Sequence, residues 1–325
     1  MSTATTAPKS QTTQRLNSGF SDWTPAQLPD LSGKTYLITG GNSGIGFEAA
    51  KMLASANANL IIACRNLVKA EQAIADLNPL GSGSIDSVQL DLSSLASVRT
   101  AATAVQQKYT QLDGLINNAG IMQTPETRTV DGFELQLATN HLGHFLLTGL
   151  LLDLVEQAAG RIVTVSSLAH KFGQMNFDDL MLTSDYEPSR AYGQSKLANL
   201  LFTFELDRKL KAAGSSVSCY ACHPGYSNTH LQSTGPQGIL NTIYKFTNRF
   251  LAQPPYNGAI PTVLAAAGLE AQPGGYYGPQ AILECRGRVS DATVAPHAQD
   301  EVAAARLWQE SETLVGYAWK PQAKG

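Results

Sequence analysis

The tyrosine and the lysine of Tyr192-Gly-Gln-Ser-Lys196 are the residues whose types and spacing most directly suggest chemistry. Residues at i and i+4 share one face of a helix, so the ammonium group would lie beside the phenol. A nearby cation favours the phenolate and lowers a pKa that starts at about 10. Such a tyrosine can exchange a proton with a substrate oxygen near neutral pH. The same spacing also occurs in solvated helices, so the prediction depends on the surrounding motifs.

A glycine-rich turn is the second chemical feature. Leu37–Gly46 has the pattern of a strand that passes into a helix through glycines at positions 40, 44 and 46. Glycine lets a backbone approach a pyrophosphate closely, and a helix N-terminus offers free N–H groups and the positive end of a dipole. Between a first strand and a first helix, this turn predicts a dinucleotide site. The residues expected to contact the dinucleotide here are Gly40, Asn42, Ser43, Gly44, Ile45 and Gly46.

Composition excludes several other classes of protein. The 325 residues are 43% hydrophobic and carry a net charge of −3, which is ordinary for a globular chain. No basic block indicates a nucleic acid or an anionic membrane surface. The apolar stretch Phe145–Leu152 is far shorter than the ~20 residues that span a bilayer. We therefore expect a small-molecule partner and no integral membrane segment.

The N-terminus differs in composition from the rest. Met1–Asn17 is rich in Ser, Thr and Gln and has no acidic residue, but it lacks the apolar periodicity of a transit peptide. No secretory signal is visible. The sequence predicts a flexible tail over residues 1–30, a cytoplasmic location without organelle targeting, and one domain over 31–325.

Four cysteines do not make a disulfide framework in a chain of this length. Cys219-Tyr-Ala-Cys222-His223 matches the pattern of haem attachment, but it falls in a predicted strand. Residues three apart in a strand point to opposite faces, so the two thiols would not converge. We expect core cysteines and no metal.

Short apolar runs alternate with helix-period segments from Gly33 onward. The predicted strands are Thr35–Thr39, Asn59–Ala63, Ser87–Leu90, Gly114–Asn117, Arg161–Ser166, Ser216–Ala221 and Ala281–Leu283. The predicted helices are Ile45–Ser55, Val68–Leu77, Leu95–Lys108, Gly132–Gln157 and Ala191–Ala213. This alternation indicates an α/β fold with a doubly wound parallel sheet of about seven strands, helices on both faces and a ligand at the strands' carboxyl ends.

These motifs together resemble the short-chain dehydrogenase/reductase family. The resemblance rests on Thr39–Gly46, Asn117-Asn118-Ala119-Gly120, Asn140, Ser167 and the Tyr192–Lys196 pair, and it runs from Gly33 to His230. It implies a single-domain Rossmann fold and hydride transfer between a nicotinamide cofactor and a carbonyl or alcohol.

The resemblance also implies a catalytic tetrad. Tyr192 would be the proton donor and acceptor, and Lys196 would lower its pKa and hold the nicotinamide ribose. Ser167 would bind the substrate oxygen, with Ser166 as its rival for that role. Asn140 would hold a water that links Lys196 to solvent.

The end of the second strand bears on the choice of cofactor. Cys64 stands where an NAD-preferring relative would carry an acid, and Arg65 can receive a 2′-phosphate. Alternatively, Arg65 is a surface residue at a helix start. The sequence favours NADP(H) over NAD(H). Asp91 is expected at the adenine and Asn117 at the ribose, while Asn118 could be structural. The full set of further expected contacts is Asn66, Asp91, Leu92, Asn117, Ala119, Gly120, Pro224, Gly225 and Thr229, besides Tyr192 and Lys196.

Two segments bear on the substrate. An apolar stripe at Ile239, Ile243, Phe246 and Phe250 either packs on the domain, lines the pocket as a lid near residues 228–256, or lies on a membrane surface. A lid of this kind implies a lipophilic substrate. Ser167 and Tyr192 are 25 positions apart, which is longer than in most of the family, so residues 171–190 should form an extra wall beside the active site.

The long gap, Cys64-Arg65-Asn66 and Tyr192-x-x-Ser-Lys-Leu-Ala-Asn199 most resemble the retinol dehydrogenase branch, to which protochlorophyllide reductases are also similar. The main alternatives to carbonyl–alcohol chemistry are a C=C reductase of an enone or pigment and a non-catalytic NADP-binding sensor or scaffold. In the family, the helix of the active-site tyrosine often forms dimer interfaces, which leaves a homodimer open.

Three histidines are also candidates for chemistry. His141 and His144 could form a metal pair on one helix face, but no third ligand stands at metal-site spacing. For these two and for His170 we expect packing and hydrogen bonding.

Overall fold

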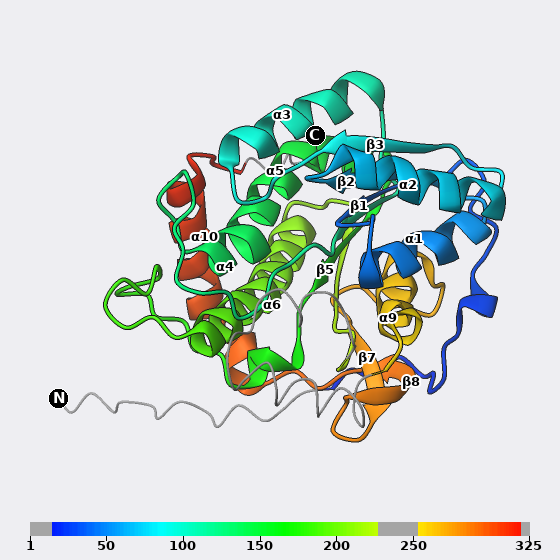
Figure 1. Ribbon diagram of the computed structural model, residues 1–325. Helices are drawn as coiled ribbons and strands as arrows, with labels where there is room; N and C mark the ends of the chain where they lie inside the picture. The colour runs from blue at the N-terminus through cyan, green and yellow to red at the C-terminus, as the bar shows by residue number, and fades with distance from the viewer. Residues whose placement is uncertain (1–14, 227–252, 320–325) are drawn as a thin grey trace.

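A single eight-stranded sheet forms the centre of the protein (Figure 1). The computed structural model describes residues 15–226 and 253–319. The strands are β1 (Thr35–Thr39), β2 (Asn59–Cys64), β3 (Ile85–Gln89), β4 (Gly114–Asn117), β5 (Arg161–Val165), β6 (Ser218–Cys222), β7 (Tyr276–Ala281) and β8 (Arg286–Asp291). Their order is β3-β2-β1-β4-β5-β6-β7-β8, and only the β7–β8 pair is antiparallel.

Helices cover both faces of this sheet. The α-helices are α1 (Gly44–Ser55), α2 (Leu67–Leu77), α3 (Leu95–Lys108), α4 (Leu135–Leu137), α5 (Gly143–Gln157), α6 (Pro188–Ala212), α9 (Pro255–Ala267) and α10 (Glu301–Val315). Short helical turns are η1 (Pro25–Gln27), η2 (Asn78–Leu80), η3 (Ala138–Leu142), η4 (Leu168–Lys171) and η5 (Pro296–Gln299). One core lies under α1, α2 and α9, and the other lies under α3, α5, α6 and α10 (Figure 1).

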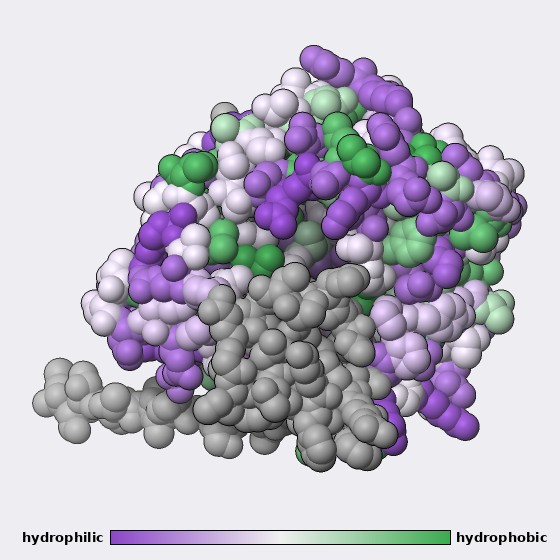
Figure 2. Space-filling model, viewed as in Figure 1, coloured by the Kyte–Doolittle hydropathy of each residue, from purple (hydrophilic) through white to green (hydrophobic). Residues whose placement is uncertain are grey.

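The apolar strands explain these two cores. Successive strand residues point to opposite faces, so Leu37 belongs to the core under α5 and α6, while Ile38 belongs to the core under α1 and α9. Parallel strands buried on both faces have near-continuous apolar sequences, as observed here. Hydrophilic residues cover most of the described surface in Figure 2, and hydrophobic residues form small separate patches there.

The sheet reverses its order between β1 and β4. The chain runs outward from β1 to β3 and then crosses back to place β4 on the other side of β1. Ligands of such sheets bind at this switch point, beyond the carboxyl ends of the strands. The glycine turn follows β1, and Asn117–Gly120 follows β4, so both motifs lie at the predicted place.

Helix α10 lies along α6 on the outer side of the second core (Figure 1). Phe145, Phe202, Trp308 and Trp319 form the aromatic cluster between them, and the Trp308 and Trp319 ring centroids are 4.8 Å apart. The N-cap Asp300 Oδ1 accepts hydrogen bonds from Val302 and Ala303 N–H at 2.9 and 3.1 Å, which starts α10.

The predicted fold class is confirmed, with eight strands where about seven were expected. The predicted strand Ala281–Leu283 is wrong beyond Ala281, because Ile282, Leu283 and Glu284 have φ of 49°, 55° and 64° and form the turn after β7. The predicted helix from Gly132 begins instead at Leu135 and contains the π-helical turn η3.

Residues 15–30, the described part of the predicted tail, lie against the domain. Trp23 is 1% exposed, and its main-chain N–H donates to Val289 O of β8 at 3.1 Å. Its Nε1 donates to Glu270 Oε2 at 2.8 Å. Packing against the domain therefore begins before residue 31. Among the helices that the structure describes, none has the length and apolarity needed to cross a bilayer.

Candidate active site

The glycine turn is held by hydrogen bonds between Thr39 and the segment that follows β4. Thr39 Oγ1 accepts hydrogen bonds from Asn118 N and Ala119 N, both at 2.9 Å. The Asn118 amide donates to Thr39 O at 2.8 Å. A Cβ on Gly46 would lie 2.4 Å from this amide nitrogen, so only glycine fits there. Asn118 therefore joins the two motifs of the switch point, which is the structural role considered for it.

The turn fits a dinucleotide phosphate. Gly40 and Gly44 have φ of 67° and 57°, a conformation that favours glycine. Ser43 is the N-cap of α1, and its side chain makes no capping hydrogen bond. The first N–H groups of α1 are thus available to an anion. The expected contacts Asn42 and Ile45 are partly exposed at the same turn.

The expected adenosine contacts lie at the ends of β2 and β3. Arg65 is exposed, and its guanidinium forms no salt bridge within the described residues. Asn66 is the N-cap of α2, and its Oδ1 accepts from Lys69 N at 3.0 Å. Asp91 Oδ1 accepts from Ser93 N at 3.0 Å, which shapes the turn that also carries the buried Leu92.

Lys196 lies at the centre of the site. It is 4% exposed, and its Nζ donates to Val165 O at 3.1 Å. The same Nζ is 5.9 Å from the centroid of the Tyr192 ring. Burial lowers the pKa of the Lys196 ammonium to about 8. Tyr192 and Lys196, whose i and i+4 spacing predicts a shared helix face, therefore lie on the same side of α6.

Asn140 reaches the same region from another element. A Cβ placed on Gly120 would lie 3.1 Å from Asn140 Oδ1 and 3.4 Å from Lys196 Nζ, so the two side chains converge on this glycine. Asn140 Oδ1 accepts from Ile121 N at 2.8 Å, and its Nδ2 donates to Ile121 O at 2.9 Å. Asn140 lies in the π-helical turn η3, and π-bulges are frequent at functional sites.

The two rival serines have different surroundings. Ser166 is 2% exposed, and its hydroxyl donates to Lys196 O at 2.7 Å. Ser167 is partly exposed, and its Oγ accepts from Ala169 N at 3.2 Å. An oxygen that accepts this bond keeps its own proton for a substrate oxygen. Of the two serines, Ser167 is therefore the one whose hydroxyl is partly exposed and keeps a proton to donate.

Asn117 ends β4 and is 1% exposed. Its Nδ2 donates to Thr148 Oγ1 at 2.9 Å, while its Oδ1 is buried without a hydrogen-bond partner in the described part of the chain. Ala119 and Gly120 continue from it into the site. The structure thus brings this segment beside the tetrad, with the Asn117 side chain turned into the protein.

Pro224 and Gly225 follow β6. Gly225 has φ of 65°, and its N–H donates to His223 Nδ1 at 3.1 Å. Gln253 Nε2 donates to Pro224 O at 2.6 Å, so the end of the predicted lid is attached here before α9 begins. Thr229, the apolar stripe at 239–250 and residues 228–252 of the predicted lid lie outside the described residues.

The histidines and cysteines pack as expected. His141 Nε2 is 2.8 Å from Ser311 Oγ of α10, and His144 Nε2 is 2.9 Å from Thr39 Oγ1, so the two rings have separate partners. Cys219 and Cys222 lie in the cores on opposite faces of the sheet. The described residues contain no group of three or more His, Cys, Asp or Glu side chains that could hold a metal ion.

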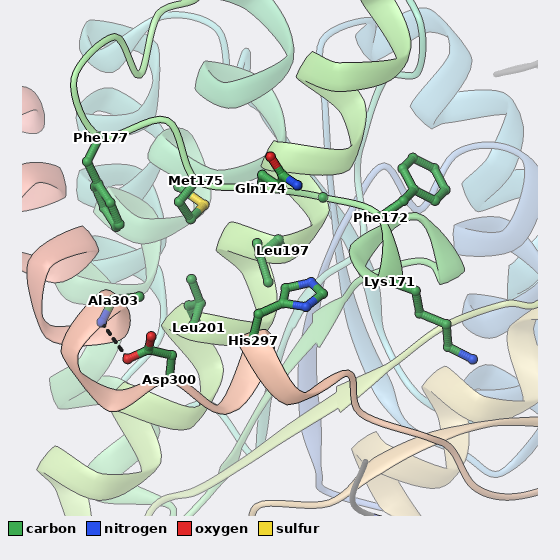
Figure 3. A pocket seen from close by; sticks show the side chains of 11 residues that line it. Lys171, Phe172, Gln174, Met175, Phe177, Leu197, Leu201, His297, Asp300 and Ala303 are labelled. Carbon is green, nitrogen blue, oxygen red and sulfur yellow. Dashed lines mark hydrogen bonds between the residues drawn. The ribbon is translucent and has the colours of Figure 1, made fainter. Parts of the chain in front are cut away.

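The inserted segment crosses α6 next to Tyr192. A Cβ on Gly173 would lie 2.3 Å from Gly193 O, so the two backbones touch. Beyond this crossing, Met175 and Phe177 line a groove of about 460 Å³ between α6 and α10 (Figure 3). The insert therefore passes beside the active site, and these two side chains pack on α6 and α10.

The comparisons with known proteins identify the family of this chain. The model of the short chain dehydrogenase family matches residues 34–238. The chain is 42% identical to human retinol dehydrogenase 13 over 296 residues, which cover 88% of this chain and 86% of that protein. Human retinol dehydrogenase 14 is 39% identical over 304 residues, with 88% and 87% covered.

A solved structure is also similar over most of the chain. It is an uncharacterised protein from Mycobacterium paratuberculosis, 40% identical, with a TM-score of 0.77 over 92% of this chain and 99% of that one. The family match covers both the glycine turn and the Tyr192–Lys196 pair. The chain belongs to the short-chain dehydrogenase family, and it is an alcohol/carbonyl oxidoreductase that acts with NAD(P)(H).

Proposed function

We propose that this protein interconverts a lipophilic carbonyl compound and its alcohol with NADP(H), and that Tyr192 donates and accepts the proton. The observation that carries the proposal is the convergence of Lys196 Nζ and Asn140 Oδ1 on Gly120, with the Tyr192 ring 5.9 Å from the ammonium. A buried cation beside a phenol favours the phenolate, as an acid–base tyrosine requires.

The proposed roles follow from the hydrogen bonds of each side chain. When bound, the cofactor supplies or accepts a hydride at the substrate carbon. Ser167 donates a hydrogen bond from its hydroxyl to the substrate oxygen and keeps its proton. Tyr192 protonates the alkoxide in reduction or deprotonates the alcohol in oxidation. Asn140 Oδ1 accepts one bond from Ile121 N, and we assign its second lone pair to a water beside Lys196.

The two adjacent serines offer a matched test. We expect Ser167→Ala to lower kcat about 10²-fold, because the substrate oxygen loses a hydrogen-bond donor in the transition state. Ser166→Ala should leave kcat within a few-fold but cost about 1–2 kcal/mol of unfolding free energy, because Lys196 O loses its buried donor. Steady-state kinetics and urea unfolding of both variants measure this. The assignment fails if Ser166→Ala is the variant that loses turnover.

The preference for NADP(H) is proposed from the end of β2. Cys64 provides no carboxylate there to repel a 2′-phosphate, and the exposed Arg65 has no salt-bridge partner among the described residues. A guanidinium is well suited to phosphate because it offers several N–H donors in one plane.

We expect Arg65→Ala to raise KM for NADPH about tenfold or more and to leave KM for NADH nearly unchanged, because only NADPH carries the 2′-phosphate. Lys108→Ala is the matched control. It also removes one positive charge, but Lys108 pairs with Asp86 near the start of β3, away from the carboxyl ends of the strands. Kinetics with both cofactors measure the ratio, and an unchanged ratio in Arg65→Ala would reject the assignment.

The lipophilic substrate is proposed from two indications. Phe172 is 64% exposed, and a Cβ on Gly193 would lie 3.2 Å from its ring, which places an exposed aromatic face beside the neighbour of Tyr192. The relatives reported above are named for retinol, a lipophilic alcohol. An apolar wall near the reacting groups favours such substrates.

The proposed function is tested with a panel of aldehydes, ketones and alcohols that includes retinaldehyde, a medium-chain aldehyde and a polar aldehyde. Oxidation of NADPH and NADH is followed at the nicotinamide absorbance, and the products are identified by proton NMR, because reduction of a C=O or of a C=C bond gives products of the same mass. We expect NADPH-dependent reduction of the lipophilic carbonyls to alcohols. A product that keeps its carbonyl, or NADPH binding without turnover of any compound, would contradict the proposal.

A further inference from the structure

His170 is a buried histidine one helical turn after Ser167, and the proposed chemistry gives it no role. It is 0% exposed. Its Nδ1 lies 2.7 Å from Ser167 O, and its Nε2 lies 3.3 Å from Ala295 N. A backbone carbonyl only accepts and a backbone N–H only donates. The ring is therefore the neutral tautomer with the proton on Nδ1, and it joins Ser167 to Ala295.

The segment after β8 holds the same turn from a second direction. His297 Nε2–H donates to His170 O at 2.8 Å. Tyr276 packs its ring edge-on against His170, with centroids 5.5 Å apart and an interplanar angle of 89°. His297 lies on the wall of the groove near the turn that carries Lys171 (Figure 3). The position of η4 thus depends on residues more than 100 positions away.

The main-chain carbonyl of Ser167 is held directly by His170. It accepts two hydrogen bonds, from His170 N at 3.1 Å and from His170 Nδ1 at 2.7 Å. On the other side, Ser166 is tied to Lys196 O of α6. The serine pair is therefore held between α6 and the segment 295–297. Burial lowers the pKa of His170 to about 4, so the ring stays neutral, as this geometry requires, near neutral pH.

We propose that His170 is a positioning residue that fixes the hydroxyl of Ser167 toward the substrate by joining the Ser167 carbonyl to the backbone of Ala295. The inference rests on the proposed role of Ser167. A displacement of about 1 Å in a group that acts on the substrate can cost about 10²-fold in rate, so a distant backbone contact of this kind has a measurable effect on kcat.

Three variants separate the two hydrogen bonds of the ring. His170→Asn places an amide nitrogen as many bonds from the backbone as Nδ1 and can keep the donor to Ser167 O. His170→Gln places an amide oxygen where Nε2 was and keeps only the acceptor for Ala295 N. His170→Phe keeps the ring and loses both. We expect kcat to fall about 10- to 100-fold in the Gln and Phe variants and about tenfold in the Asn variant, because it too loses the bond to Ala295 N, with KM for NADPH changed less than twofold.

A double variant tests whether the effect passes through Ser167. In a Ser167→Ala background, His170→Gln should lower kcat by less than twofold, while its effect on Tm stays the same as in the wild type. Because His297 is exposed, His297→Ala serves as a variant that folds, and it should lower kcat about threefold. His141→Gln removes another buried imidazole, bonded to Ser311, and should lower Tm with kcat within twofold.

The inference is overturned if His170→Gln and His170→Phe keep kcat within twofold of the wild type. It is also overturned if His170→Gln lowers kcat by the same factor with and without Ser167. A Ser167→Ala variant of full activity would instead remove the proposed function on which the inference rests, so the two failures can be told apart.

Discussion

The Tyr192→Phe variant is expected to lose turnover almost completely, with kcat at least about 10³-fold below that of the wild type. Phenylalanine keeps the ring that packs 5.9 Å from Lys196 Nζ and removes only the hydroxyl. General acid–base catalysis contributes about 10²–10⁴-fold, and the proposal assigns the transferred proton to the Tyr192 hydroxyl alone. The Kd for NADPH should change less than about twofold, because the glycine turn and Arg65 are untouched.

Turnover is measured at the nicotinamide absorbance, and cofactor binding by fluorescence titration of the same protein. Tyr186→Phe is the matched control. It removes a hydroxyl six positions earlier, whose bond goes to Thr124 O at 2.8 Å, and it should keep kcat within about threefold. Activity retained in Tyr192→Phe would refute the proposed acid–base role.

The central strands could be predicted because burial on both faces imposes a simple pattern. The bounds of β1 and β4 agree with the prediction, since Thr35–Thr39 and Gly114–Asn117 are apolar runs between polar turns. The last two strands, at one end of the sheet, lack that pattern. β7 contains Gly278 and Pro279, and β8 is exposed over its first three residues, so neither is a continuous apolar run. The apolar pair Ile282–Leu283 predicts the end of a strand but forms an exposed turn.

The functional side chains of the site could be predicted from motifs, but the turns and hydrogen bonds that position them could not. The spacing of Tyr192 and Lys196 predicts one shared helix face, and the Tyr192 ring does lie 5.9 Å from Lys196 Nζ, which is near Gly120. The sequence does not reveal the π-helical turn that carries Asn140, because a change from i+4 to i+5 bonding leaves no clear compositional pattern. It also does not reveal the bond between His170 and Ala295, which joins residues 125 positions apart.

Lys196→Met is expected to separate the functional and structural effects of the buried ammonium. Without the cation the charge that favours the Tyr192 phenolate is lost, so kcat should fall about 10²-fold or more. Methionine has a similar length and carries no charge. The loss of activity should therefore come with a gain in stability at neutral pH, which a general disruption of the site would not give.

The pH dependence of this gain is fixed by the direction of the pKa shift. Burial lowers the pKa of Lys196 from 10.5 to about 8, so between these values the unfolded chain binds more protons than the folded protein. Below pH 8 the buried ammonium therefore lowers the unfolding free energy of the wild type by the full amount. This loss becomes smaller as the pH rises toward 10.5. Relative to Lys196→Met, the recovery should be about 3 kcal/mol, since one pKa unit corresponds to about 1.4 kcal/mol.

Urea unfolding of both cofactor-free proteins from pH 7 to 10.5 measures the difference, and the other titrating groups cancel because they are common to both. Parallel curves would mean that the ammonium is not destabilised by burial. Unfolding free energies of the two proteins that converge as the pH rises would mean that the buried Lys196 ammonium lowers the stability of the wild type. A cation beside a phenol accounts for such a cost when the phenol must release and take up a proton, since stability is often lost where a site is arranged for activity.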